Sequence, residues 1–127
     1  MNKKKIKLVV YGTKKENEIS RAVFRIVLGD EKPKKIDQIN LIFAMPPFGC
    51  EKREKKTRIG YEMSDTNLRL ATIFIHPSMN KKMKTTTIAH EFRHVIQDNS
   101  WSKKDADNNL RCENDAYSYE RAIEKLL

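Results

Sequence analysis

The sequence predicts an α+β domain, and three features of its hydrophobic pattern lead to that prediction. Short apolar segments rich in β-branched residues, bounded by Gly or Pro, are typical of strands. One amphipathic helical pattern separates the first two of these segments. Two further helical patterns follow the last strand. In a chain of 127 residues, this arrangement predicts one domain, residues 1–127, built around one hydrophobic core.

The first half of the chain supplies a strand, a helix and a second strand. Residues 6–11 have the composition of a first strand. Between 16 and 28 the apolar residues recur at helical spacing, and Gly29 stands where a C-cap glycine is expected to end the helix. Residues 36–45 form the second strand, because the Pro-Pro pair that follows cannot continue a hydrogen-bonded ladder.

The second half completes a small mixed sheet of three to four strands and adds two helices. Residues 50–58 are highly charged and predict either a loop or a hairpin arm. A short strand is expected over 59–63 and a firmer one over 68–75, where apolar side chains occupy both faces. Helices are expected over 85–98 and 108–126.

The first of these two helices contains His90-Glu91-Phe92-Arg93-His94, which is the pattern H-E-x-x-H. Two histidines four residues apart lie on one helical face, so both imidazoles can reach one tetrahedral zinc ion. A glutamate beside the first histidine is suited to take a proton from water at that ion. The motif therefore predicts a site for one Zn²⁺, with His90 and His94 as ligands and Glu91 as the catalytic base.

The surroundings of the motif agree with a helix that has one buried face. Thr85, Thr86 or Thr87 is expected to cap its amino-terminal end. An apolar stripe at positions i, i+4, i+7 and i+8 is expected to face the core: Ile88, Phe92, Val95 and Ile96. The two histidines project away from this stripe, so they are not core-filling residues.

A catalytic zinc ion needs a third protein ligand and one open position. Glu113 follows His94 after 18 residues, near the start of the last predicted helix, and is the favoured ligand. Asp107, Asn108 or Asn109 is expected to cap that helix. The main rival ligand is Glu120, two turns further along. The remaining alternatives are Asp105, Asp107 and Asp115.

His90-Glu91-x-x-His94, 18 residues and then Glu113 resembles the gluzincin clan of zinc metallopeptidases, including its minimal single-domain members. The matched region covers about the carboxy-terminal third of the chain. The resemblance implies a zincin-like fold and one zinc ion on the two histidines and the distant glutamate. It also implies hydrolysis of a peptide bond by a zinc-activated water, with Glu91 as the general base.

The same resemblance implies a place for the substrate. In such enzymes the strand before the motif helix forms the edge of the sheet, and an extended peptide pairs with it through main-chain hydrogen bonds. That strand corresponds here to residues Ala71, Thr72, Ile73, Phe74 and Ile75.

The chain also departs from the clan. Thermolysin-like members have an aspartate four positions after the glutamate ligand, where it supports a histidine; this chain has Tyr117 there. Support must then come from elsewhere, with Asp115, Glu120 or a backbone carbonyl as candidates. An oxyanion needs a further donor, and Tyr117, Tyr119, Tyr61 and His76 have suitable chemistry. DNA-associated SprT-like proteases use a third histidine, and none follows His94 in this chain.

Charge leaves an alternative function open. The net charge is +9, which favours acidic partners. The lysines are scattered in short runs without interleaved aromatic residues, however, so a nucleic-acid partner is less favoured than a peptide or protein substrate. The alternative is a basic regulatory module that binds nucleic acid or protein and has a structural or vestigial zinc site. A regulatory protease with one cellular target is a third hypothesis.

The sequence also predicts a cytoplasmic location without a membrane partner. No signal-peptide core and no apolar run long enough to span a bilayer are seen. Cys50 and Cys112 lie far apart, and we expect both to be reduced thiols. Cys50 is expected to be a loop cysteine; the alternative is a latency ligand at the open zinc position.

Overall fold

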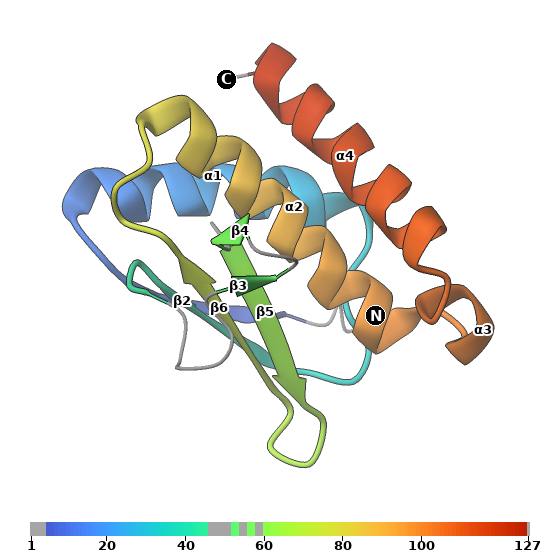
Figure 1. Cartoon of the computed structure of the whole chain (residues 1–127). Helices are drawn as coiled ribbons and strands as arrows, with labels where there is room; N and C mark the ends of the chain where they lie inside the picture. Colours follow the sequence, from blue (N-terminus) through green and yellow to red (C-terminus); the bar gives the residue numbers. More distant parts are fainter. Residues whose placement is uncertain (1–4, 46–51, 54–55, 58–59, 127) are drawn as a thin grey trace.

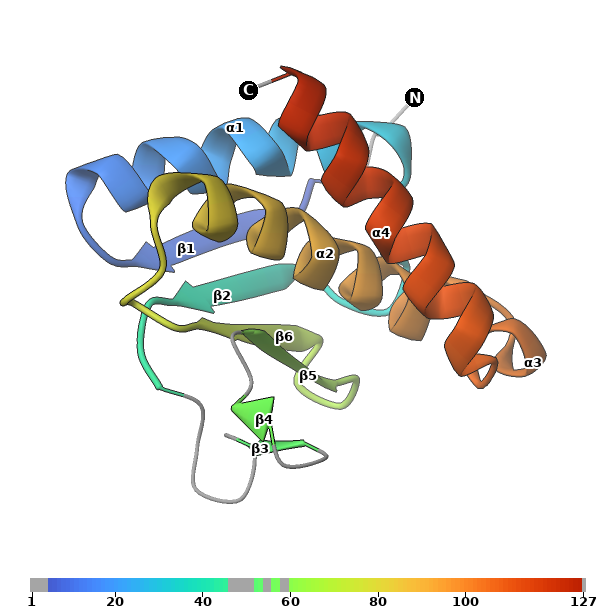
Figure 2. The same cartoon turned by 45° about the horizontal axis from the view of Figure 1, so that its top comes forward.

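The computed structural model of the chain contains a four-stranded sheet with helices α1 and α2 on one face (Figures 1 and 2). It describes residues 5–45, 52–53, 56–57 and 60–126. The α+β class predicted from the sequence is confirmed. The elements of the sheet and the helices are β1 (Lys7–Tyr11), α1 (Lys14–Asp30), β2 (Gln38–Ile42), β5 (Gly60–Asp65), β6 (Leu70–Ile75), α2 (Lys81–Ser100), α3 (Lys103–Ala106) and α4 (Asn109–Leu126).

The strands lie in the order β1-β2-β6-β5 across the sheet. β1, β2 and β6 are parallel, and β5 pairs antiparallel with β6. Parallel strands require a crossover, which α1 provides between β1 and β2. Within the described ranges, β1 and β5 are therefore the edge strands.

This order corrects the predicted substrate edge. β6 is an interior strand because its Ile73 aligns with Leu41 of β2 on one side and with Glu62 of β5 on the other. β5 pairs antiparallel with β6 and occupies the side of β6 that was expected to be free. The residues predicted to form the substrate edge therefore lie inside the sheet: Ala71, Thr72, Ile73, Phe74 and Ile75.

Helix α1 is longer than predicted, and the expectation for Gly29 is wrong. The helix begins after Thr13, whose hydroxyl accepts from the Glu16 amide, while the Glu16 carboxylate accepts from the Thr13 amide. It continues through Gly29 to Asp30, and the chain leaves it at Glu31 in an extended conformation with φ −150°. The left-handed residue that a C-cap glycine supplies is not used here.

Helix α2 begins four residues before the predicted position. Asn80 caps it, accepting from the Met83 amide at 2.9 Å. The threonines expected to form the cap lie inside the helix instead, where Thr85 and Thr86 donate to backbone carbonyls one turn earlier. The N-cap is thus an asparagine in the polar segment before these threonines, and the sequence pattern did not single it out.

Helix α4 agrees closely with the prediction and lies alongside α2 (Figures 1 and 2). Asn108, one of the three candidates, accepts from the Arg111 amide at its amino-terminal end. The single-turn helix α3 between α2 and α4 was not predicted. In the charged segment, β3 (Lys52–Arg53) and β4 (Lys56–Thr57) pair antiparallel, as in the hairpin alternative.

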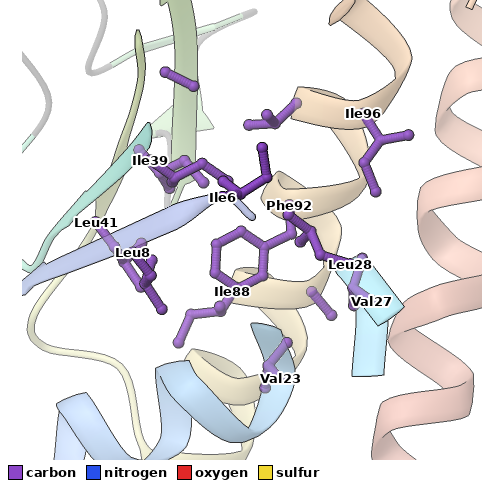
Figure 3. Packing of buried hydrophobic residues seen from close by; sticks show 14 of the residues in the cluster. Ile6, Leu8, Val23, Val27, Leu28, Ile39, Leu41, Ile88, Phe92 and Ile96 are labelled. Carbon is purple, nitrogen blue, oxygen red and sulfur yellow. The ribbon is translucent and has the colours of Figure 1, made fainter. Parts of the chain in front are cut away.

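The core lies between the sheet and the two helices on its face (Figure 3). Phe92 is fully buried and packs edge-to-face against Phe24 of α1, with ring centroids 5.8 Å apart. The apolar stripe predicted for α2 is confirmed, because all of its members are buried: Ile88, Phe92, Val95 and Ile96. Since this face binds the sheet, the opposite face of α2 is left for the histidines. None of the helices in the described part of the chain combines the length and apolar character that crossing a membrane requires.

Replacing Phe92 tests the anchoring of the motif helix. Phe92→Ala removes the largest fully buried side chain and leaves a cavity, so we expect a loss of about 3–5 kcal/mol in the free energy of unfolding. Urea denaturation measures it. Leu110→Ala is the control, because Leu110 is 73% exposed and should change stability by less than about 0.5 kcal/mol. Equal effects of the two substitutions would contradict the assignment of this core.

Candidate metal centre

Two helices bring the predicted site residues together. α2 carries His90 and His94 on the side that faces α4, and α4 carries Glu113 and Glu120 on the side that faces α2. Ala116, between the two glutamates, is fully buried. Because its side chain is a single methyl group, the two helices can approach closely at this point.

The donor atoms converge on one place. His90 Nε2 and His94 Nε2 are 2.9 Å apart. The Glu113 carboxylate lies 2.9 Å from His94 Nε2 and 3.4 Å from His90 Nε2. Ligand atoms of a tetrahedral zinc ion lie about 3.3 Å apart when each is about 2.0–2.1 Å from the metal. The chemistry and the separations of these two imidazole nitrogens and one carboxylate are suited to one zinc ion, which stays a prediction.

Glu91 belongs to the same cluster. One of its carboxylate oxygens lies within 4.8 Å of donor nitrogens of both His90 and His94. Glu91 is buried where β5 begins, and a Cβ added to Gly60 would stand 2.8 Å from the Thr87 methyl and 3.1 Å from the Glu91 carboxylate. A larger residue at position 60 would therefore crowd both side chains. Glu91 thus lies between the histidines and the edge strand.

Each histidine has a second partner at Nδ1. Glu120 accepts from His90 Nδ1 at 2.6 Å, and Gln97 Oε1 lies 2.8 Å from His94 Nδ1. Glu120 thus supports the ring from the side opposite Nε2, the arrangement expected of a second partner to a ligating histidine. Among the predicted candidates for this support, Glu120 is the residue that contacts the ring.

The environment of His90 favours its charged form. Burial disfavours a charged imidazolium, but the hydrogen bond to Glu120 and the nearby charges of Glu91, Glu120 and Glu113 outweigh burial and raise the pKa of His90. Three carboxylates around two imidazoles create a site that attracts a cation.

Glu120, the main rival ligand, contacts Nδ1 of His90 and not Nε2, and the three rival aspartates lie elsewhere. Asp115 accepts hydrogen bonds from Arg93 Nε and Nη2, and Asp105 pairs with Arg111. Asp107 follows the end of α3 and is exposed. None of these three aspartates lines the cleft described next.

The donor cluster opens into a cleft of about 420 Å³ between β5, α2 and α4. Glu113 is 38% exposed, whereas His90 and His94 are 13% and 19% exposed. The histidines are thus held in the wall while the cluster stays open toward solvent on the side of Glu113. The polar residues of the wall are Glu62, Thr87, His90, Glu91, His94, Gln97, Asp98, Asn109, Glu113, Tyr117 and Glu120.

Of the four predicted oxyanion donors, only Tyr117 lines the cleft among the described residues, while Tyr61, Tyr119 and His76 do not. Tyr117 lines the cleft, and its ring centroid lies 4.9 Å from that of His90. Burial, together with Glu113 and Glu120, raises the pKa of Tyr117, which keeps its hydroxyl a donor. His76 is not brought to the cleft: it follows β6, and its Nδ1 contacts the Ser78 hydroxyl at 2.7 Å. Tyr117 as an oxyanion donor stays a prediction.

Glu62 and Asp98 form a carboxyl pair that was not predicted. Glu62 is on β5 and accepts from Ser64, and Asp98 is one turn beyond His94 on α2. Burial, the hydrogen bond with Asp98 and the charges of Asp98 and Glu91 raise the pKa of Glu62 to about 9. The i+4 spacing from His94 could have revealed Asp98. No sequence signal marks Glu62, since the strand pattern does not tell which element lies opposite.

Of the two cysteines, Cys112 lies in the wall of the cleft as a buried free thiol. Its Sγ donates to the backbone carbonyls of Asp105 and Ala106. Burial and nearby carboxylates raise the pKa of this thiol, so it is not poised to ionise. Cys50, considered above as a latency ligand, lies outside the described residues.

Comparison with known proteins adds no family to these observations. Protein-family models, curated proteins and solved structures give no match to the chain.

Glu62→Gln tests the carboxyl pair through pH. Glu62 has a higher pKa in the folded chain than its ordinary value of 4.5. The folded state therefore binds more protons than the unfolded state between about pH 5 and 9, and stability falls as pH rises through this window. Glu62→Gln lacks that loss. We expect its stability relative to wild type to increase by about 1–3 kcal/mol from pH 5 to 9.

Urea denaturation at pH 5, 7 and 9 measures this difference. Glu18→Gln, an exposed change on α1, should follow wild type at all three values. A difference between Glu62→Gln and wild type that does not vary with pH would mean that Glu62 is an ordinary ionised carboxylate.

Proposed function

We propose that the protein is a zinc-dependent metallopeptidase whose ion is held by His90, His94 and Glu113. One observation carries the proposal: two imidazole nitrogens and a carboxylate converge within 2.9–3.4 Å of one another beside an open cleft. The H-E-x-x-H motif and the 18-residue spacing are the sequence features that support the same site. The partial exposure of Glu113 leaves room for a substrate.

The chain's own residues supply the acid–base chemistry. A zinc ion bound at this site would polarise the scissile carbonyl and lower the pKa of water. Glu91 takes the proton of the attacking water and delivers it to the departing amine, so it serves first as base and then as acid. Glu120 holds the His90 ring by its hydrogen bond. Tyr117 donates its hydroxyl proton to the oxygen on which negative charge develops.

We further propose that an extended peptide pairs with β5 rather than β6. β5 is an edge strand within the described ranges and begins beside Glu91. A peptide added to this edge would place its carbonyl groups along the cleft by main-chain hydrogen bonds. The recognition mode, in which a peptide pairs with the edge of the sheet, is the one expected from the sequence; only the strand differs.

The charge of the cleft favours this function over nucleic-acid binding. Although the chain has a net charge of +9, no lysine or arginine is among the described residues that line the cleft. Carboxylates surround it instead, and these repel phosphate. The basic module therefore has no support at this cleft. A cytoplasmic location remains a prediction.

Glu91→Gln separates catalysis from metal binding. The amide cannot accept the proton, so we expect hydrolysis of a fluorogenic peptide library to fall by about 10²–10⁴-fold. Zinc content, measured by atomic absorption, should remain at one ion per chain because Glu91 is not a ligand. Glu18→Gln changes an exposed carboxylate on α1 and should keep both properties. Undiminished cleavage by Glu91→Gln would rule out this mechanism.

A further inference from the structure

Gln97 has a position that the mechanism above leaves unexplained. It lies on α2 one turn beyond His94, is fully buried, and forms part of the floor beside the cleft. A buried amide is costly unless each of its polar atoms has a partner. The amide oxygen of Gln97 and both hydrogens of its amide nitrogen have partners, and these partners together fix the orientation of the side chain.

The amide nitrogen of Gln97 has two hydrogens, and both are used. Nε2 donates to the backbone carbonyl of Cys112 at 2.8 Å and to the carboxylate of Asp115 at 2.9 Å. Both partners are acceptors, since one is a backbone carbonyl and the other is a carboxylate to which Arg93 also donates. A flipped amide would direct its oxygen at two acceptors. The orientation of Gln97 is therefore determined by its neighbours.

This orientation also determines the proton on His94. Gln97 Oε1 is the atom that faces the ring, 2.8 Å from His94 Nδ1. An amide oxygen only accepts, so Nδ1 must carry the hydrogen. Nε2 is then the ring nitrogen left to meet His90 Nε2 and Glu113, and it would offer its lone pair to a zinc ion bound there.

The bonds of Gln97 also cross between the two helices of the site. Cys112 is the residue before Glu113, and Asp115 is two residues after it, so the amide grips α4 on both sides of the third donor. Arg93 completes the contact: it binds Asp115 of α4 and pairs with Glu31, beyond α1, at 3.1 Å. A shift of α4 relative to α2 would therefore disturb the bonds of Gln97 together with the contact between Glu113 and His94.

We propose that Gln97 is a positioning residue for the metal site, which orients the His94 ring through Nδ1 and places Glu113 through one amide group. The proposal rests on the proposed function, because it concerns how tightly the same three donors hold zinc. Partners of this kind typically change metal affinity by about 10–100-fold when removed.

The main experiment compares the zinc affinity of wild type with that of Gln97→Met, using competition with a chromophoric chelator. Methionine has similar length and fills the buried site but offers no amide. We expect the dissociation constant for zinc to rise by about 10–100-fold. Asn99→Leu is the matched control: Asn99 is also fully buried on α2, and its amide bonds to Ser64 and to the Val95 carbonyl, away from the cleft. It should lower the melting temperature without changing zinc affinity.

A second measurement needs no variant. Long-range ¹H–¹⁵N NMR of the metal-free wild-type protein reports whether Nδ1 of His94 carries a hydrogen. A hydrogen on Nδ1 is expected, because the Gln97 oxygen that faces this nitrogen can only accept. A bare Nδ1, or an equal zinc affinity in Gln97→Met and wild type, would overturn the role of Gln97. Failure of the wild type to bind zinc would instead refute the proposed function, and the hydrogen on Nδ1 would still test the orientation set by Gln97.

Discussion

The position of α4 against α2 is the constraint on which the candidate site depends. Two charged or polar residues of α2, Arg93 and Gln97, both bind Asp115 of α4. Arg93 is 7% exposed and its guanidinium lies 4.5 Å from the centre of the Tyr119 ring. A buried charge of this kind must keep its partner. The pairing therefore fixes the register of the two helices, which in turn brings Glu113 to the two histidines.

Local features of the site were predictable because they depend on spacing along one helix. The i, i+4 relation places His90 and His94 on one face whatever the helix packs against. The apolar stripe that includes Phe92 then determines which face is buried. Even the return of the chain to Glu113 was within reach, because a polar segment between two helical patterns indicates a reversal. These predictions needed only the periodicity of the sequence.

Other features depend on which helices and strands become neighbours in space, and the periodicity of the sequence does not indicate these neighbours. Leu70 to Ile75 reads as a strand whether it lies inside the sheet or at its edge, so the substrate edge was assigned wrongly. Gly29 is of a residue type typical of helix ends, but it lies within α1. The carboxyl pair of Glu62 and Asp98 joins a strand to a helix 36 positions later. Its effect on the pKa of Glu62 arises from burial between them.

X-ray absorption at the zinc edge of the zinc-loaded protein tests the central claim most directly. The account predicts two imidazole nitrogens and carboxylate or solvent oxygen at about 2.0–2.1 Å, without sulfur in the coordination shell. A zinc–sulfur distance of about 2.3 Å would contradict it, because the ion would then bind a cysteine such as Cys112 in the cleft wall. A shell with fewer than two imidazoles would contradict it equally.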